Sequence, residues 1–527
     1  MAALIVLSFS SIALTQNIQK AESWLRAEAE RKEQRAKRLL TGAGTITDNQ
    51  EKYDVHYYAL KLDLDVAEEY LAGEMTVKAW ALDSLHHIEL NLLDEMRVDS
   101  VLDRGKRLSF GHVDDLIHVN LSAPVSPDSS FSLSVYYSGY PENGTRMHFG
   151  FDTYQNKPMI WSLSEPFGAR TWWPCKDYPK DKADSVNIYI TVPQDLIVAS
   201  NGRLVKTTPL GEKRTFHWHE QYPIATYLVS VAIHPYINYQ DWYITASGDS
   251  ILLDYYVFAE HLSALKNNYA KTPEMMSVFS ERFGEYPFPE EKYGHAEFLW
   301  GGGMEHQTIS SLGYWGEILI AHELAHQWWG NMVTCENFHH IWLNEGFATY
   351  AEALWKEYLG GADAMRQWMN YKRYLGEGTV FVEDPLQDDI FHYELTYMKA
   401  GWVLHMLRHV VGETVFFELL HEYRERFYFK TAVTKDFQTV CEAVSGMDLE
   451  PFFQQWIYES GYPFYRYTWK TEKTSSGNYL LSIMIHQVQD DVVYQMPIDM
   501  QLQFTAGDST IVLQNSKRSQ AVRAHCI

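Results

Sequence analysis

One short run, His322-Glu323-Leu324-Ala325-His326, restricts the folds open to this chain more than any other feature. Positions four apart on a helix share a face, so His322 and His326 point the same way if this run is helical. Eighteen residues separate His326 from Glu345, which lies in a second segment of helical character. The spacing therefore predicts two helices packed side by side, with both histidines and Glu345 facing one point.

Two neutral imidazoles and one carboxylate form a ligand set that suits zinc. Three protein ligands leave the fourth position open, which is typical of a catalytic site, and Glu323 can then act as a base on water. The alternative is a buried helix with two core histidines, because Ile318 to Trp329 is apolar almost all round. Histidines and a glutamate buried without partners are costly, which favours the metal site.

A further carboxylate, Glu352, lies two helical turns after Glu345 on the same face. It can either hold a ligand histidine from behind or remain a plain surface carboxylate. The sequence favours the surface carboxylate.

The chain is too long for a single core, and its net charge is strongly negative. At 527 residues we expect several domains, and a net charge of −24 argues against nucleic acid as a partner. The four cysteines are scattered, so no disulfide scaffold or cysteine zinc site is inferred.

The N-terminal 49 residues divide into two parts. Residues 1–15 are apolar and serine-containing, which predicts a secretory signal peptide and a secreted, periplasmic or otherwise extracytoplasmic protein. The alternative is a buried or disordered N-terminus, and the alternative location is cytoplasmic. Residues 16–49 are expected to form an exposed, charged helix or a tether, followed by a linker. No other segment approaches 18 uninterrupted apolar residues, so we expect no transmembrane span in the mature chain.

From Tyr53 onward, apolar and polar residues alternate with a period of two, which predicts an all-β domain over residues 50–254. Strands are expected at 53–64, 73–81, 87–92, 116–121, 131–137, 186–192, 216–219 and 227–233. Within this domain, residues 161–175 are an aromatic segment with one acid and one arginine. It either packs against the neighbouring domain or lines a cleft, and spacing alone does not decide.

Residues 255–463 have helical spacing and are expected to form the domain that holds the zinc. In it, Gly301-Gly302-Gly303 allows a close approach of the backbone to a ligand. The second helix of the zinc site is expected to stop at Gly360-Gly361. The alternation of apolar and polar residues returns after Pro463, which predicts a C-terminal β domain at 464–527. This domain is short for a sandwich, and it is expected to be either truncated or divergent. Its last residues, 516–527, do not have the pattern of a strand.

These motifs together resemble the aminopeptidase N family of zinc metallopeptidases, the gluzincin aminopeptidases. The resemblance rests on three items: H-E-x-x-H-x18-E, the run Gly302-Gly303-Met304-Glu305-His306 in place of G-x-M-E-N, and Tyr397-Met398-Lys399-Ala400 in place of Tyr-x-Lys-Gly. It covers about residues 50 to 500. It implies a multidomain α+β fold with an all-β N-terminal domain, a thermolysin-like, mainly helical catalytic domain and a C-terminal β-sandwich-like segment.

The resemblance also implies roles for single residues. His322, His326 and Glu345 are expected to hold one zinc ion per chain, with Glu323 as the general base. Tyr397 is expected to donate a hydrogen bond to the oxyanion. The substrate would be bound by Glu305, Glu165, Gly302, Gly303 and Met304, with the two glutamates on its free α-amino group.

The sequence departs from the family pattern at three positions. His306 stands where Asn is usual, Gly303 where Ala is frequent, and Ala400 where Gly is usual. The two essential side chains of these motifs, Glu305 and Tyr397, are intact.

We therefore expect a zinc aminopeptidase that acts on peptides with free N-termini. Two alternatives remain: a hydrolase of a small non-peptide substrate, and an inactive, metal-bound scaffold. The intact Glu323 and Tyr397 argue against the scaffold.

Overall fold

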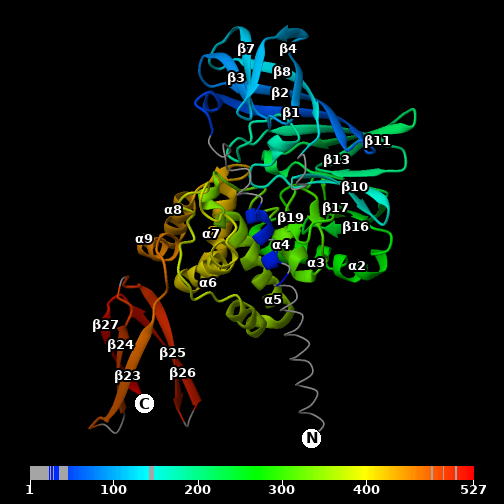
Figure 1. Cartoon of the computed structure of the whole chain (residues 1–527). Coiled ribbons are helices and arrows are strands. Elements are labelled where there is room, and N and C mark those ends of the chain that lie inside the picture. Colours follow the sequence, from blue (N-terminus) through cyan, green and yellow to red (C-terminus); the bar gives the residue numbers. More distant parts are fainter. Residues whose placement is uncertain are drawn as a thin grey trace.

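The computed structural model describes residues 23, 25–27, 29–34, 46–141, 148–475, 479–490, 492–504 and 507–526. The predicted signal peptide at residues 1–15 lies outside the described residues. Figure 1 shows a β-rich part at one end, a mainly helical part in the middle, and a separate group of strands at the C-terminal end. This arrangement confirms the predicted fold class.

The N-terminal part is built from strands with alternating burial, as β11 shows with its buried residues at every second position. Its elements are η1 (Gln50–Lys52), β1 (Tyr53–Asp65), β2 (Tyr70–Ala81), β3 (Leu85–Asn91), β4 (Arg97–Asp103), β5 (Lys106–Leu108), β6 (Phe110–Val113), β7 (Leu116–Val125), β8 (Ser130–Gly139), β9 (Phe149–Tyr154), β10 (Lys157–Ser162), η2 (Ala169–Thr171), β11 (Ser185–Pro193), β12 (Ile197–Ser200), β13 (Arg203–Leu210), β14 (Lys213–Glu220), η3 (Thr226–Leu228) and β15 (Val231–His234).

Three sheets organise these strands in the described part of the chain. The largest has the order β13-β14-β11-β1-β2-β8-β4-β5, and the others are β3-β7-β6 and β12-β15-β10-β9. The strand expected at 227–233 is shorter than predicted, because residues 226–228 form the 3-10 turn η3 and only Val231–His234 pairs as β15.

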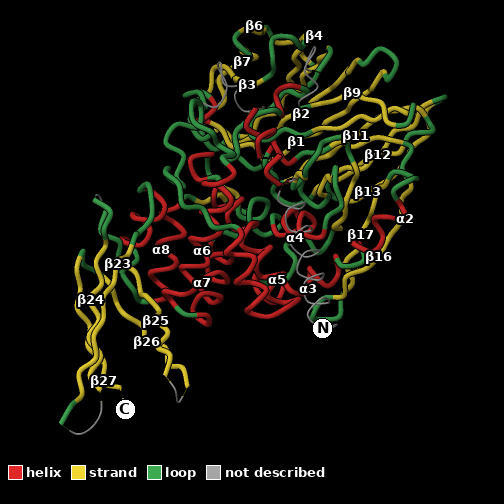
Figure 2. Tube along the Cα trace, turned by 60° about the horizontal axis from the view of Figure 1, so that its bottom comes forward, coloured by secondary structure: helices red, strands yellow, loops and turns green. Residues whose placement is uncertain are grey.

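The middle part combines one small sheet with packed helices, which Figure 2 shows in red below the strands. Its elements are β16 (Ile237–Ile244), β17 (Ser250–Val257), α2 (Leu262–Tyr269), α3 (Thr272–Phe283), β18 (Lys292–Glu297), β19 (Gly303–Met304), β20 (Ser310–Leu312), α4 (Glu317–Ala325), β21 (Thr334–Cys335), η4 (Phe338–His340), α5 (Trp342–Tyr371), η5 (Tyr393–Lys399), α6 (Ala400–Val411), α7 (Glu413–Arg426), β22 (Thr431–Ala432), α8 (Thr434–Ser445), α9 (Glu450–Phe453) and η6 (Gln454–Tyr458).

The boundary expected between residues 254 and 255 falls inside strand β17. This strand pairs in parallel with β18, and the sheet order is β16-β17-β18-β20-β19. The alternation that marks the β domain continues into β16 and β17, so the sequence pattern does not change where the sheets change. The structure therefore places both strands with the helical part.

The C-terminal part has two small sheets, β23-β24-β27 and β25-β26, among the described residues. Their strands are β23 (Tyr465–Lys473), β24 (Tyr479–Gln487), β25 (Met496–Phe504), β26 (Gly507–Asn515) and β27 (Ser519–Cys526). The expectation that the last residues are not a strand is wrong. β27 pairs with β24 from Tyr479 to His486, because main-chain pairing between strands does not require a clear apolar alternation in the sequence.

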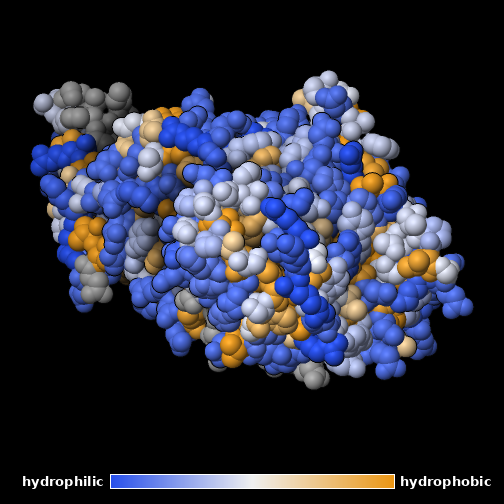
Figure 3. Space-filling view, turned by 90° about the horizontal axis from the view of Figure 1, so that it is seen from above, coloured by the Kyte–Doolittle hydropathy of each residue, from blue (hydrophilic) through white to orange (hydrophobic). Residues whose placement is uncertain are grey.

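One continuous apolar core runs through the N-terminal and middle parts, whereas the C-terminal strands have a small core of their own. Seen from above, the surface is mostly hydrophilic, with apolar residues in scattered small groups (Figure 3). Among the described residues, no helix is both long enough and apolar enough to cross a bilayer.

The described residues between 23 and 34, which are 23, 25–27 and 29–34, are helical and lie in the middle of the molecule beside β19 and α4 (Figure 1). The expectation of an exposed, charged helix is wrong for this stretch, because Leu25, Ala29 and Lys32 are all buried. These three residues are spaced i, i+4 and i+7, which places them on one face of the helix. The charged side chains that suggested exposure lie mostly on its other faces.

Candidate metal and amine site

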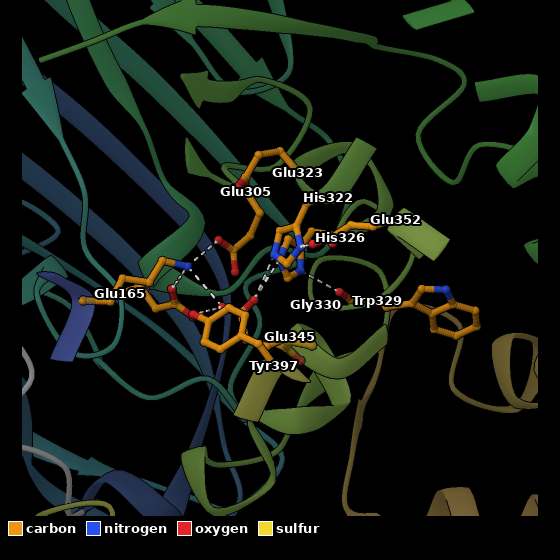
Figure 4. Close-up of polar contacts among 12 residues, drawn as sticks. Glu165, Glu305, His322, Glu323, His326, Trp329, Gly330, Glu345, Glu352 and Tyr397 are labelled. Atoms are coloured by element: carbon orange, nitrogen blue, oxygen red, sulfur yellow. Dashed lines mark hydrogen bonds and ion pairs between the residues drawn. The ribbon is translucent and has the colours of Figure 1, made fainter. Parts of the chain in front are cut away.

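The two predicted helices bring the expected ligand atoms together. Helix α4 carries His322, while His326 follows directly after the helix with helical backbone angles. Glu345 lies in the first turn of α5. Its Oε2 atom is 3.1 Å from His322 Nε2 and 3.3 Å from His326 Nε2, and Figure 4 shows the three side chains converging.

This donor set fits a zinc ion. Two donors of a tetrahedral zinc site lie about 3.3 Å apart when each is about 2.0–2.1 Å from the ion. His326 Nδ1 donates to the Trp329 carbonyl at 3.0 Å, so its Nε2 presents a lone pair. His322 Nδ1 is likewise held, 2.9 Å from Glu352 Oε1. All three side chains are buried, and together they form a group able to hold a metal ion.

Glu352 is a partner of the ligand set, so the favoured prediction of a surface carboxylate is wrong. It is fully buried, and its second oxygen accepts from Lys372 Nζ at 3.0 Å and Trp368 Nε1 at 3.2 Å. Burial alone raises the pKa of Glu352, but Lys372 and His322 outweigh it and lower the pKa. Helical spacing gave its face correctly, but the residues that cover that face come from later in the chain.

The carboxylate of Glu323 lies against Gly303. Glu323 is fully buried on α4, one residue after His322. A Cβ atom at position 303 would stand 2.2 Å from its Oε1 atom. Glycine at this position therefore makes room for the carboxylate where the structure has it.

Tyr397 reaches the same point from a different element. It lies in η5, a π-helix over Tyr393–Lys399, and its hydroxyl donates to Glu345 Oε1 at 3.0 Å. π-helical turns occur frequently at functional sites because the extra residue changes which side chains face inward. Sequence spacing alone does not predict this geometry.

A second acidic group adjoins the first. Glu165, Glu305 and Glu345 are all buried, and their oxygens lie within 4.8 Å of one another. Burial and the nearby Glu305 raise the pKa of Glu165 well above its usual range, although Lys32 opposes them. Three buried carboxylates so close together require a cation.

Lys32 supplies that cation. Its Nζ atom is 2.8 Å from Glu165 Oε2, 3.2 Å from Glu305 Oε2 and 3.2 Å from Glu345 Oε1. Burial alone lowers the pKa of Lys32, but the three carboxylates outweigh it and raise the pKa well above its ordinary value. The side chain is therefore a buried ammonium ion.

The aromatic segment 161–175 packs against the middle part of the molecule, which is one of its two alternatives, because the ring centre of Trp161 lies 5.8 Å from that of Phe298 and the ring centre of Phe167 lies 4.9 Å from that of Phe338. Its arginine and a tryptophan are packed and hydrogen-bonded, with Arg170 Nε 2.9 Å from Asp177 Oδ2 and Trp172 Nε1 3.0 Å from Ser164 Oγ. These contacts fix the backbone around Glu165, which reaches the acidic group.

The glycine-rich run ends in an edge strand beside the site. Gly303 and Met304 form β19, which pairs with β20 and is the last strand of its sheet. Gly302 accepts a backbone hydrogen bond from Gly313 at 2.8 Å. Glu305 follows directly, and its carbonyl accepts from Asn331 Nδ2 at 2.6 Å.

Sequence reasoning missed Lys32, Lys372 and the pair Tyr227 and Asn344. The Asn344 side-chain amide, in the first turn of α5, donates to the Tyr227 hydroxyl at 3.2 Å. For Lys32 a signal existed, since it falls on the stripe of Leu25 and Ala29. No local pattern identifies the other three, because they meet only through the tertiary fold.

Comparison with known proteins is consistent with this geometry. The profile "Peptidase M1 N-terminal domain" matches residues 54–228, and "Peptidase family M1 domain" matches residues 305–456. Together these spans cover more than half of the chain. Aminopeptidase M1 of Arabidopsis thaliana is 28% identical over 367 residues, which are 62% of this chain and 39% of that protein. Glutamyl aminopeptidase of Homo sapiens is 28% identical over 379 residues, 64% of this chain and 38% of that protein. The chain thus spans about two fifths of the length of these curated relatives.

Solved structures share the fold. An M1 zinc metallopeptidase from Deinococcus radiodurans superposes with a TM-score of 0.71 and 27% identity, covering 79% of this chain and 96% of its own. Legionella pneumophila aminopeptidase A, solved with aspartic acid, gives a TM-score of 0.77 at 18% identity, covering 92% of this chain and 58% of its own. The latter likeness is one of fold alone.

Proposed function

Because the chain belongs to peptidase family M1, we propose that it is a zinc-dependent aminopeptidase that hydrolyses the first peptide bond of peptides with a free N-terminus. One observation carries the proposal. Glu345 belongs both to the zinc-type group with His322 and His326 and to the acidic group with Glu165 and Glu305. An ammonium bound at the acidic group lies beside the ligand set, so only the peptide bond next to that ammonium is within reach.

His322, His326 and Glu345 would hold one zinc ion per chain. When bound, zinc supplies Lewis-acid chemistry, because it polarises the scissile carbonyl and lowers the pKa of a water molecule. The acidic group contains only carboxylates and already surrounds an ammonium ion. We therefore assign the acidic group to an amine and not to a second metal.

Two residues carry the proton transfer and the charge stabilisation. Glu323 accepts a proton from the attacking water and passes it to the leaving amine as the C–N bond breaks. The Tyr397 hydroxyl, already 3.0 Å from Glu345, donates a hydrogen bond to the carbonyl oxygen as it becomes negative.

The acidic group sets the selectivity for a free N-terminus. Glu165 and Glu305 pair with the α-ammonium group of the peptide, and an N-acetylated peptide would leave both carboxylates buried without a cation. Gly302 and the two residues of β19, Gly303 and Met304, would align the peptide main chain along this last strand of the sheet.

The test is the turnover of aminoacyl-anilides, free and N-acetylated, with and without a zinc chelator. We expect turnover of the free substrates only, and its loss with chelator. Cleavage of the acetylated substrates would contradict the role of the two glutamates and favour a hydrolase of another kind. Activity that survives removal of all zinc would contradict the zinc assignment.

A further inference from the structure

The helical segment at residues 23–34 places its own ammonium group where the proposed substrate would place one. Lys32 Nζ lies within 3.2 Å of Glu165, Glu305 and Glu345, and the side chain is completely buried. A lysine side chain ends in a primary ammonium with three N–H donors, as does the N-terminus of a peptide. The same three carboxylates cannot pair with both at once.

The segment is held on both sides of the site. On one side, Arg26 pairs with Glu394 and lies 4.9 Å from the ring centre of Tyr393, both in the π-helix that carries Tyr397. On the other side, the Arg31 guanidinium lies 5.4 Å from the ring centre of Trp300, just before the glycine-rich run.

The same helix also contributes an apolar anchor. Leu25 and Ala29 are buried in the continuous core, and Lys32 Nζ lies 5.4 Å from the ring centre of Phe391. The segment therefore occupies the amine end of the site through several independent contacts.

We propose that residues 23–34 are an intramolecular inhibitor in which Lys32 takes the place of the substrate's α-ammonium group. This inference rests on the proposed function of the acidic group. The chain is latent while the segment is in place, and a peptide binds only when the segment withdraws. A tethered group competes at a high effective concentration, so even modest contacts keep it bound.

The size of the effect follows from the occupancy. If the segment fills the site for 99% of the time, the apparent affinity for a peptide falls about 100-fold. A segment with a purely structural role would contribute to folding stability and leave the affinity unchanged. Measurements of KM and of peptide affinity therefore distinguish an inhibitory segment from a purely structural one.

The test uses the full chain with Lys32→Met and Lys32→Ala, and Gln34→Ala as the matched control. Methionine keeps the length of the side chain without its charge, and Gln34 is exposed on the same segment. With an aminoacyl-anilide substrate we expect kcat/KM to rise at least about 10-fold in both Lys32 variants, mainly through a lower KM. Gln34→Ala should match the wild type. An unchanged KM in a folded Lys32→Met protein, as judged by thermal unfolding, would overturn the proposal.

Peptide binding separates this proposal from the proposed reaction. Calorimetry with an unblocked dipeptide is done on zinc-loaded protein carrying Glu323→Gln, with and without Lys32→Met. Tighter binding with Lys32→Met supports the inhibitor even if no variant turns over any substrate, in which case only the reaction is wrong. Normal turnover with equal dipeptide affinity in both proteins overturns the inhibitor and leaves the reaction standing.

Hydrogen exchange gives a readout without catalysis. In the zinc-loaded Glu323→Gln protein, a saturating unblocked dipeptide should accelerate deuterium exchange at the amides of residues 29–34, because the bound dipeptide displaces Lys32 from the three carboxylates. An N-acetylated dipeptide should leave this exchange unchanged, and an equal response to both dipeptides, or none to either, would contradict the displacement of the segment.

Discussion

At the scale of single residues, the site contains some side chains that can be predicted from the sequence and others that cannot. The pair His322 and His326 with Glu345 could be predicted, because helical spacing and ligand chemistry both restrict them. Glu352 and Lys372 could not, because the break inside α5 at Gly360 and Gly361 brings the end of the helix back to Glu352, which sequence spacing does not show. A surface and a buried glutamate look alike in a one-dimensional pattern.

Glu352→Gln should weaken zinc binding by about 10- to 100-fold, because the amide holds His322 Nδ1 less strongly than a carboxylate does. The measurement is zinc affinity by competition with a chelator. Glu357→Gln is the matched control, since Glu357 lies on the same helix but pairs with Arg408. Equal zinc affinity in the two variants would show that Glu352 does not support the ligand.

Tyr397→Phe should lower kcat by about 10²- to 10³-fold with little change in KM, because the hydroxyl acts on charge that develops in the transition state. Steady-state kinetics at constant zinc content measure this. Tyr350→Phe serves as the control, since its hydroxyl lies 3.3 Å from Arg408 and away from the ligands. A rise in KM alone would indicate a role in substrate binding instead.

His295 should make the fold sensitive to acid. It is fully buried among tyrosine rings, neither ring nitrogen has a hydrogen-bond partner among the described residues, and burial lowers its pKa to about 3. The unfolded chain, with a pKa of about 6.5, binds a proton there between about pH 6.5 and 3, so the free energy of unfolding falls as the pH falls through this window. The loss approaches roughly 5 kcal/mol at the acid end.

The substitution His295→Phe should therefore shift the midpoint of acid unfolding of the zinc-free protein to lower pH. The control is His86→Phe, which replaces an exposed histidine on β3. If both variants unfold at the wild-type pH, protonation of His295 does not contribute to acid unfolding.

At the scale of elements, the sequence predicts the long, regular strands correctly, but not the elements with an irregular backbone or without a clear apolar spacing. Alternation identified the long strands of the N-terminal part, because each buries one face. It missed β27 and the π-helix η5, whose backbones are determined by neighbouring strands and helices and not by their own apolar spacing. The burial of Leu25, Ala29 and Lys32 is not predicted, because the charged composition around them hides a narrow apolar face.

The predicted stop at Gly360-Gly361 is a break inside α5. Gly361 has φ 69° and ψ −169°, a combination open almost only to glycine, and a Cβ there would meet no atom within 4 Å. Gly361→Ala should therefore destabilise the protein through its backbone alone, by about 1–3 kcal/mol. Thermal unfolding should show a lower midpoint. The control is Gly111→Ala, because Gly111 lies in open space at an ordinary φ, and this substitution should leave the midpoint of thermal unfolding unchanged.

At the scale of the whole molecule, stability is unevenly distributed. The small C-terminal core contains Leu481, Ile483, Ile485 and Leu513, whereas the main core runs through the rest of the described chain. Regions with few buried apolar contacts open at lower free energy. We expect the amides of β25 and β26 to exchange with deuterium well before those of β1 and β2, as measured by mass spectrometry. Equal protection would mean that the strands unfold together with the main core.

The acidic group and the apolar core both extend from the N-terminal part into the helical part. Glu165 comes from the former and Glu305 from the latter, and Lys182 Nζ joins the two parts by donating to the carbonyls of Asn331 and Met332 at 2.7 and 3.0 Å. In evolutionary terms, neither part is a module that recombination can exchange freely. A foreign β domain would arrive without the matching half of the core and with its own version of the loop around Glu165. The two parts must therefore be inherited, and must diverge, as one unit.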